Sequence, residues 1–243
     1  MNTTFPDSLI PGHDAARLRT LHQFKIVNTT PEQIFDDYVA WAAQLFNTPI
    51  ALISLVDAEY VWFKAVAGAT GIPGLVRNES MCSAAILATE QVVISDYKPE
   101  SCNLIKPDVA QSIGLNFYAG AALVASDDAR LGMLAVIDKN ARDFSAAEAT
   151  VLTRLAELVS QTIELRYRYI LAEQPGEWED AQRELTLALD ENSALARYLI
   201  SRNQRIDLAD IEVAQPILRR LEGVAKVLSR RLGQSLTASS VID

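Results

Sequence analysis

Three side chains in the middle of the sequence could together hold a small molecule. Trp62 and Lys64 are two residues apart in a run of β-branched and aromatic residues, and Arg77 follows in a glycine-containing loop. Alternate residues of a β-strand face the same side, so the indole and the ammonium group would project together. An aromatic ring beside cations can clamp an anionic or planar ligand. The alternative is structural: either cation could form an ion pair that closes the loop over the sheet, with Asp96 or Asp138 as its partner.

Two further side chains complete the candidate site. Tyr118 falls in another strand-like stretch, where its hydroxyl could point into the same cavity or its ring could fill the core. Cys82 is a free cysteine, and such a residue is most often small, buried and apolar in character. The candidate ligand-binding residues are Trp62, Lys64, Arg77, Cys82, Asp96, Tyr118 and Asp138.

The chain does not contain the residue patterns that common cofactors and catalytic centres need. It has two cysteines, Cys82 and Cys102, and two histidines, His13 and His22, which both precede the predicted sheet. Haem usually requires an axial histidine, and structural zinc requires four Cys or His ligands at matched spacing. No Ser or Cys has a His and an acid close by, and no glycine-rich phosphate loop occurs. We therefore expect no cofactor and no metal, and we predict that the chain is not an enzyme.

Composition and charge narrow the class of protein further. Of the 243 residues, 49% are hydrophobic and 22% are charged, as in an ordinary globular protein that folds without disulfides. The formal net charge of −9 argues against a nucleic-acid-binding surface, which needs clustered Lys and Arg. No apolar run approaches the ~20 residues of a membrane span, and the first residues do not resemble a signal peptide. These features predict a cytoplasmic protein with no nucleic-acid or membrane partner.

Two predicted β-hairpins position the candidate residues. In both, β-branched and aromatic runs flank a short turn that contains Asp. Before the first hairpin, Thr30 is a typical helix N-cap and Pro31 is typical of the first helical position. The predicted elements are helices at 14–25, 31–46 and 80–89, strands at 50–56, 61–67, 92–95, 117–124 and 131–138, and loops at 68–78 and 99–114.

Helical patterns follow the second hairpin. Ser145 and Glu148 form a capping box that opens a long helix. The helix carries apolar residues at alternating spacings of four and three, as in a coiled coil; they are Val151, Leu155, Leu158, Thr162, Leu165 and Tyr169. Two more helical stretches follow, which could dimerise or fold back on the domain. We predict a homodimer with the 145–171 helix as its seam, and a chain divided into an arm (1–13), an α+β domain (14–172) and a helical tail (173–243).

Six stretches occur in a recognisable order along the chain. They are Thr30-Pro31-Glu32-x-x-Phe35-Asp36, Pro49 to Asp57, Trp62-Phe63-Lys64, Arg77-x-x-Ser80-x-Cys82, Phe117 to Leu123 and Gly132-x-Leu134-x-Val136-Ile137-Asp138. Together they resemble the GAF domains of bacterial signalling proteins, from about residue 14 to about residue 172. The resemblance implies an α+β fold with a central antiparallel sheet of about six strands. Helices would cover one side of the sheet, and a small-molecule pocket would lie on the other.

The resemblance predicts a sensory or regulatory module in signal transduction. A small effector would bind under the loops at 68–78 and 99–114, and the long helices would relay the change of state. One alternative is a scaffold without a small ligand, whose tail docks a separate signalling protein. The other is a thiol-redox enzyme of the methionine sulfoxide reductase type that uses Cys82 or Cys102.

Overall fold

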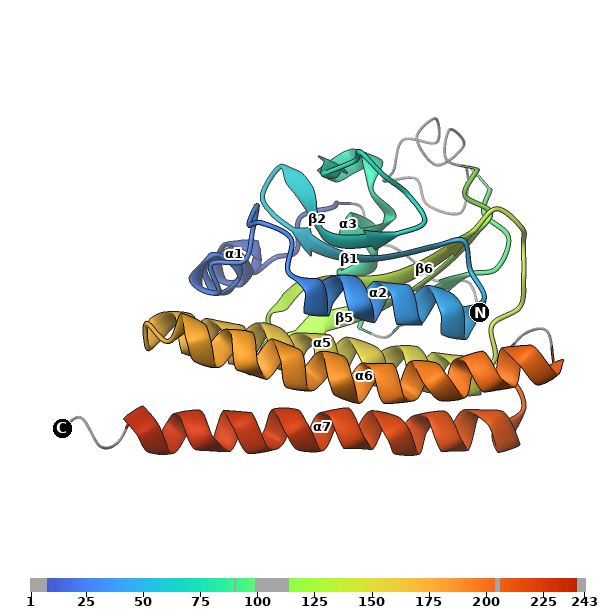
Figure 1. Ribbon diagram of the computed structural model, residues 1–243. Coiled ribbons are helices and arrows are strands. Elements are labelled where there is room, and N and C mark those ends of the chain that lie inside the picture. Colours follow the sequence, from blue (N-terminus) through green and yellow to red (C-terminus); the bar gives the residue numbers. More distant parts are fainter. Residues whose placement is uncertain (1–7, 90, 99–113, 204–205, 240–243) are drawn as a thin grey trace.

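An antiparallel β-sheet forms the centre of the molecule (Figure 1). The computed structural model describes residues 8–89, 91–98, 114–203 and 206–239. Over these residues the sheet has six strands in the order β3-β2-β1-β6-β5-β4, and each neighbouring pair is antiparallel. The strands are β1 (Ile50–Val56), β2 (Tyr60–Ala67), β3 (Gly74–Val76), β4 (Val92–Ile94), β5 (Phe117–Val124) and β6 (Arg130–Asp138). This confirms the α+β fold and the six-stranded sheet that the resemblance implied.

The two predicted hairpins occupy the middle of the sheet. β1 pairs with β2, β5 pairs with β6, and β1 also lies against β6, with Ile53 opposite Leu134. Six of the seven residues of β1 are buried, because both faces of the sheet are covered. An almost continuous apolar run in the sequence therefore marks a central strand here.

Helices α2 (Gln33–Phe46) and α5 (Ala146–Leu171) cover one face of the sheet (Figure 1). The predicted capping box opens α5: Ser145 Oγ accepts a hydrogen bond of 3.2 Å from the Glu148 N–H, and the Glu148 carboxylate accepts one of 2.7 Å from the Ser145 N–H. Alternate strand residues point to this face, among them Ile53 and Phe117. They form the larger of the two cores together with the helices.

The tail folds back on the domain. Helix α6 (Pro175–Asn203) packs on α2 and α5, and helix α7 (Ile211–Ser239) packs on α5 and α6, so these helices form an outer layer (Figure 1). All six heptad residues of α5 are at most 5% exposed within this one chain. The prediction that they form a dimer seam is therefore wrong in this structure, because the chain's own core covers them. The homodimer itself stays a prediction.

The opposite face of the sheet carries a smaller set of elements. Helix α3 (Met81–Ala85) and the 3-10 helix η1 (Arg77–Glu79) lie over it, and a second apolar core fills the space between. Helix α1 (Asp14–Gln23) packs beside β6. The buried residues of this second core include Leu52, Val56, Val61, Cys82, Ile86, Tyr118, Met133, Ala135 and Ile137.

Two predicted segments differ from the structure, and a third lies mostly outside the described residues. Helix α2 begins at Gln33 rather than Pro31, because Glu32 stays extended and its side chain is drawn into an ion pair. The 68–78 stretch, predicted as a loop, contains β3 and the start of η1. Most of the predicted 99–114 loop lies outside the described residues.

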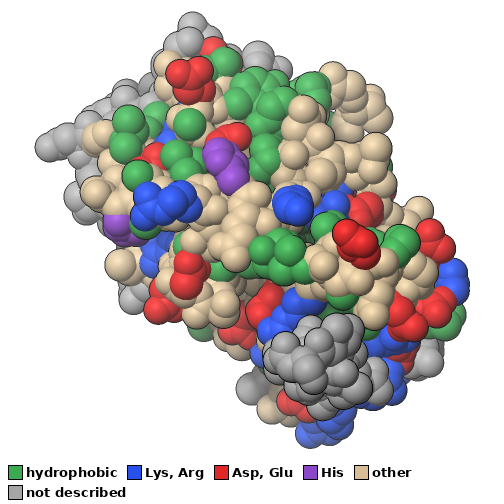
Figure 2. Space-filling model, turned by 90° about the vertical axis from the view of Figure 1, so that its left-hand side faces the viewer, with side chains coloured by type: hydrophobic (Ala, Val, Ile, Leu, Met, Phe, Trp, Pro, Cys, Tyr) green, Lys and Arg blue, Asp and Glu red, His purple; other side chains and the backbone are tan. Residues whose placement is uncertain are grey.

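Charges of both signs share the end of the molecule where α1 lies (Figure 2). On the described part of this face, basic and acidic side chains are intermixed around the helices. Charges also pair between the helices of the outer layer: Arg231 of α7 contacts Glu184 at 2.9 Å and Glu177 at 3.4 Å, both on α6. The described part of this face therefore carries charges of both signs (Figure 2).

Candidate functional site

A small apolar cavity lies between the sheet and helix α3, and we call it the α3 cavity. Its volume is about 90 Å³. It is bounded by β1 and β2, by the segment that leads through β3 to α3, and by the start of β5 and the end of β6. Its lining residues are Ile50, Leu52, Phe63, Val66, Ala69, Ile72, Leu75, Glu79, Ser80, Met81, Cys82, Leu115, Tyr118 and Ile137.

Cys82 and Tyr118 place two polar groups in this apolar wall. The Tyr118 hydroxyl donates a hydrogen bond of 3.6 Å to the Cys82 sulfur, and both side chains are buried. Ser80 caps α3 by accepting the Cys82 N–H at 3.3 Å, which holds the backbone of Cys82 in the first turn of the helix. Burial raises the pKa of the Cys82 thiol and of the Tyr118 phenol, so both groups are uncharged near neutral pH. The cavity wall here offers neutral hydrogen-bonding groups.

Lys64 lies on the other face of the sheet. Its ammonium group donates hydrogen bonds of 2.6 Å to the Glu32 carboxylate, 2.9 Å to the Thr29 hydroxyl and 2.8 Å to the Thr30 carbonyl. These contacts occupy all three of its N–H donors. It also lies 5.2 Å from the centre of the Phe35 ring. Lys64 is thus part of a buried ion pair beneath α2 and does not line the α3 cavity.

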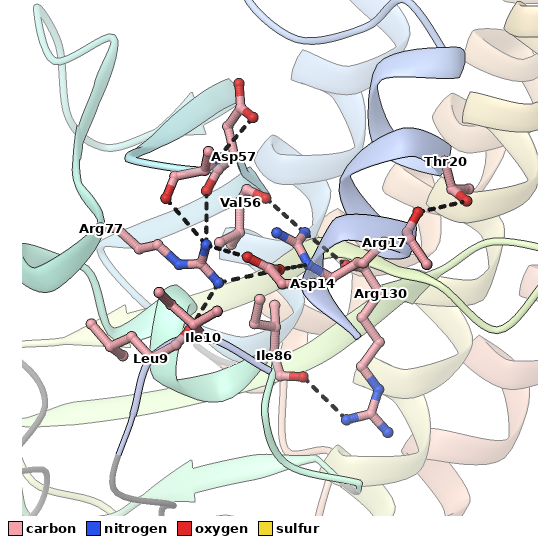
Figure 3. A network of polar contacts seen from close by, with 12 residues as sticks. Leu9, Ile10, Asp14, Arg17, Thr20, Val56, Asp57, Arg77, Ile86 and Arg130 are labelled. Carbon is pink, nitrogen blue, oxygen red and sulfur yellow. Dashed lines mark hydrogen bonds and ion pairs between the residues drawn. The ribbon is translucent and has the colours of Figure 1, made fainter. Parts of the chain in front are cut away.

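Arg77 belongs to a second polar network, shown in Figure 3. Its guanidinium contacts the Asp14 carboxylate at 2.9 Å and donates to the backbone carbonyls of Leu9, Asp57 and Ala58 at 2.8, 3.3 and 3.2 Å. Arg17 binds the same carboxylate at 2.6 Å. The two guanidinium groups therefore fasten α1 and the preceding chain to the turn between β1 and β2. Arg77 has a structural role at this place.

The remaining candidates are also separate from the cavity. Trp62 packs against the core beneath the helices, with its ring 4.7 Å from that of Tyr60. Asp96 is exposed and pairs with Lys98 at 3.3 Å. Asp138 accepts a hydrogen bond of 2.9 Å from the N–H of Asn140 at the end of β6. Of the seven predicted site residues, only Cys82 and Tyr118 line the α3 cavity.

Most of the cavity wall is apolar, and the sequence patterns above did not predict it. The wall includes apolar side chains from two strands, which have no polar group that would suggest a binding site. They are Leu52 of β1 and Phe63 and Val66 of β2. The available signal was the alternation of the strand, which places Phe63 opposite Lys64. It could not place Val66, because a register shift in the β1–β2 pairing leaves Lys64 without a partner and interrupts the alternation. Lys64 and Arg77 do form ion pairs, as the structural alternative held, but with Glu32 and Asp14 rather than with Asp96 or Asp138.

The surroundings of Cys82 do not favour thiol chemistry. The thiolate is the reactive form of cysteine, and the raised pKa keeps this thiol protonated. Cys102 lies outside the described residues. Within the described part of the chain, no group of three or more His, Cys, Asp or Glu residues could hold a metal ion. Among the same described residues, no helix is long and apolar enough to cross a membrane.

The fold and sequence together define the class of protein. The GAF domain family model matches residues 30–163, which is more than half of the chain, so this chain belongs to the GAF domain family. Solved structures to which this chain is similar include the GAF domain of a phosphoenolpyruvate-protein phosphotransferase from Acinetobacter. It is 18% identical, with a TM-score of 0.45 over 64% of this chain and 95% of that one. Another is a free methionine-R-sulfoxide reductase from Neisseria meningitidis, 18% identical, with a TM-score of 0.47 over 70% and 99% of the two chains.

A more informative relative is a cyclic di-GMP phosphodiesterase of Pseudomonas aeruginosa. It is 30% identical over 189 residues, which make up 76% of this chain and 32% of the relative. The chain therefore spans about a third of the relative's length. The prediction that this chain is not an enzyme is contradicted by this comparison, because the relative is named for a phosphodiesterase activity. That prediction depended on motifs for nucleophiles and phosphate loops, which mark only some classes of enzyme.

Proposed function

We propose that this chain is a sensory GAF domain of cyclic di-GMP signalling, in which a small uncharged molecule occupies the α3 cavity and alters a cyclic di-GMP phosphodiesterase activity. Membership of the GAF family supports the signalling role, and the relative from Pseudomonas aeruginosa supports the link to cyclic di-GMP. The observation that carries the proposal is the apolar cavity between α3 and the sheet face opposite α2 and α5.

The lining of the cavity defines the class of ligand. Apolar side chains form most of the wall, and Cys82 and Tyr118 contribute neutral polar groups. Glu79 is the one charged residue among the described lining residues and none of them is basic, so this wall offers no cation to bind an anion. A volume of about 90 Å³ is below the ~150 Å³ of an engineered apolar cavity that binds benzene. The ligand is therefore small, uncharged and mainly apolar.

A substitution that fills the cavity tests the link to cyclic di-GMP. Ala69 lines the cavity, whereas the adjacent Thr70 is exposed and does not, so Ala69→Phe and Thr70→Phe form a matched pair. The cellular cyclic di-GMP concentration would be measured by mass spectrometry in the source organism, at equal amounts of each variant. The proposal expects Ala69→Phe to change that concentration at least about twofold, and Thr70→Phe to match the unaltered protein. Equal concentrations in all three strains would refute it.

The predicted homodimer is a separate proposal. With the α5 heptad residues covered, a dimer would have to use another surface, such as the outer faces of α6 and α7. Leu187 of α6 is 65% exposed and is one apolar group available there. Light scattering on the purified chain would measure the mass, and Leu187→Glu would lower it if this face is the interface.

A further inference from the structure

A single buried carboxylate connects the sheet to two of the long helices. Glu32 Oε2 accepts hydrogen bonds from Lys64 at 2.6 Å and from Arg166 Nε at 2.8 Å. Glu32 Oε1 accepts from Arg166 Nε at 2.9 Å and from the indole N–H of Trp178 at 2.8 Å. We call these four residues the Glu32 cluster. They come from the start of α2, from β2, from α5 and from α6, so the cluster links four elements that are far apart in the sequence.

The cluster is well shielded from water. The side chains of Lys64, Arg166 and Glu32 are 1%, 8% and 14% exposed, and Trp178 is 7% exposed. Arg166 also donates to the Lys25 carbonyl at 3.0 Å. Buried charges depend strongly on their partners, since an unpaired buried charge is costly. Displacing one of the charged groups without its partners would therefore be costly.

Strand β2 reaches both this cluster and the α3 cavity. Phe63 and Val66 line the cavity, while Lys64, next to Phe63, holds Glu32 on the opposite face. On its outer side β2 pairs only with the three residues of β3 among the described strands. A ligand that pushes on Phe63 therefore acts on a strand near the sheet edge, whose next residue is fixed to α5 and α6 through Glu32.

We propose that the Glu32 cluster is the device that transmits occupancy of the α3 cavity, through β2, to the position of helices α5 and α6. The regulatory meaning of this coupling rests on the proposed function of the cavity. The coupling itself is a property of the chain and can be measured without a ligand. A second contact between α2 and α6, the 2.7 Å hydrogen bond from Thr186 to Asp37, does not include β2 and so provides a control.

Fluorine NMR on the full chain labelled with 5-fluorotryptophan would measure the coupling. The chain has three tryptophans, Trp41, Trp62 and Trp178, and Trp→Phe variants assign their signals. Phe63→Leu changes the cavity face of β2. It should shift the Trp178 signal by more than its linewidth, and the Trp62 signal serves as the report from β2 itself.

Variants of the cluster then decide the proposal. In a Lys64→Met background, Phe63→Leu should no longer shift the Trp178 signal, whereas in a Thr186→Val background the shift should remain. Ile137→Val changes the same cavity from β6 and should leave the Trp178 signal in place. If Lys64→Met does not fold, Lys64→Gln, which keeps a polar end without the charge, takes its role. The proposal would be overturned if Phe63→Leu did not shift the Trp178 signal. It would also be overturned if the shift remained in the Lys64→Met background. Since no ligand is used, this result is independent of whether the cavity binds one.

Discussion

Phe63 and Lys64 are neighbours in the sequence and lie on opposite faces of the sheet. The Phe63 ring lines the α3 cavity, and the Lys64 ammonium group is 2.6 Å from the Glu32 carboxylate beneath helix α2. One strand thus connects an uncharged cavity with a buried cluster of charges. The ligand-binding proposal depends on the first of these residues, and the proposed coupling depends on the second.

Removal of the Glu32 charge should destabilise the fold strongly. Glu32→Gln leaves the buried Lys64 and Arg166 without a carboxylate, so we expect a loss of about 3–5 kcal/mol in the free energy of unfolding. Glu164→Gln is the control, because the Glu164–Arg168 pair on α5 is partly exposed and should contribute less than about 1 kcal/mol. Urea denaturation followed by circular dichroism measures both. Equal losses of unfolding free energy for the two variants would show that the Glu32 cluster stabilises the fold no more than a partly exposed ion pair does.

The stabilisation by Glu32 should depend on pH. Burial opposes ionisation of this carboxyl group, but the hydrogen bonds and charges of Lys64 and Arg166 outweigh it and hold its pKa below the usual 4.5. A lowered pKa in the folded state means that the stabilisation is complete above the usual carboxyl pKa and is lost as pH falls through the lowered value. The difference in unfolding free energy between the unaltered chain and Glu32→Gln should therefore be constant near pH 7 and shrink below about pH 4.5. A difference that does not change between pH 7 and pH 3 would contradict this.

Arg77 should matter for stability rather than for ligand binding. Arg77→Lys removes several of the hydrogen bonds to Asp14 and to the carbonyls of Leu9, Asp57 and Ala58, which a lysine cannot all replace. We expect a loss of about 1–3 kcal/mol, with faster hydrogen exchange in α1. Any molecule held in the α3 cavity should stay bound. If Arg77→Lys lost that molecule while hydrogen exchange in α1 stayed unchanged, Arg77 would be a ligand-binding residue after all.

Much of the sheet could be predicted from the sequence because its signals are local. The strand at Phe117–Val124 has the predicted bounds, and the capping box at Ser145 opens α5 as expected. β3 was missed because glycine usually marks a loop. Here Gly74 allows a close approach, since a Cβ at this position would lie 2.1 Å from the Val61 carbonyl oxygen.

The site was harder to predict because its partners are distant in the chain. Lys64 and Arg77 look like ligand-binding cations in the sequence, yet their partners Glu32 and Asp14 lie 32 and 63 residues away. Alternation along β2 did place Trp62 and Lys64 on the same face. It could not show which face carries the cavity, because that depends on where α2, α5 and α3 pack.

The Cys82 thiol should react slowly in the native protein. It is 3% exposed, and burial raises its pKa, so little thiolate forms at pH 7.5. Iodoacetamide treatment followed by peptide mass spectrometry should find Cys82 unmodified in the folded chain and modified after unfolding in urea. Rapid modification of Cys82 in the folded chain would contradict this expectation and support the thiol-redox hypothesis.

Native mass spectrometry tests the central claim, that the α3 cavity holds a small uncharged molecule, most directly. The chain would be purified gently from the organism that produces it, and its native mass compared with its denatured mass. We expect a consistent extra mass that is lost on denaturation, is absent from Ala69→Phe and is retained by Thr70→Phe. A bare chain, or an extra mass that Ala69→Phe retains, would contradict it.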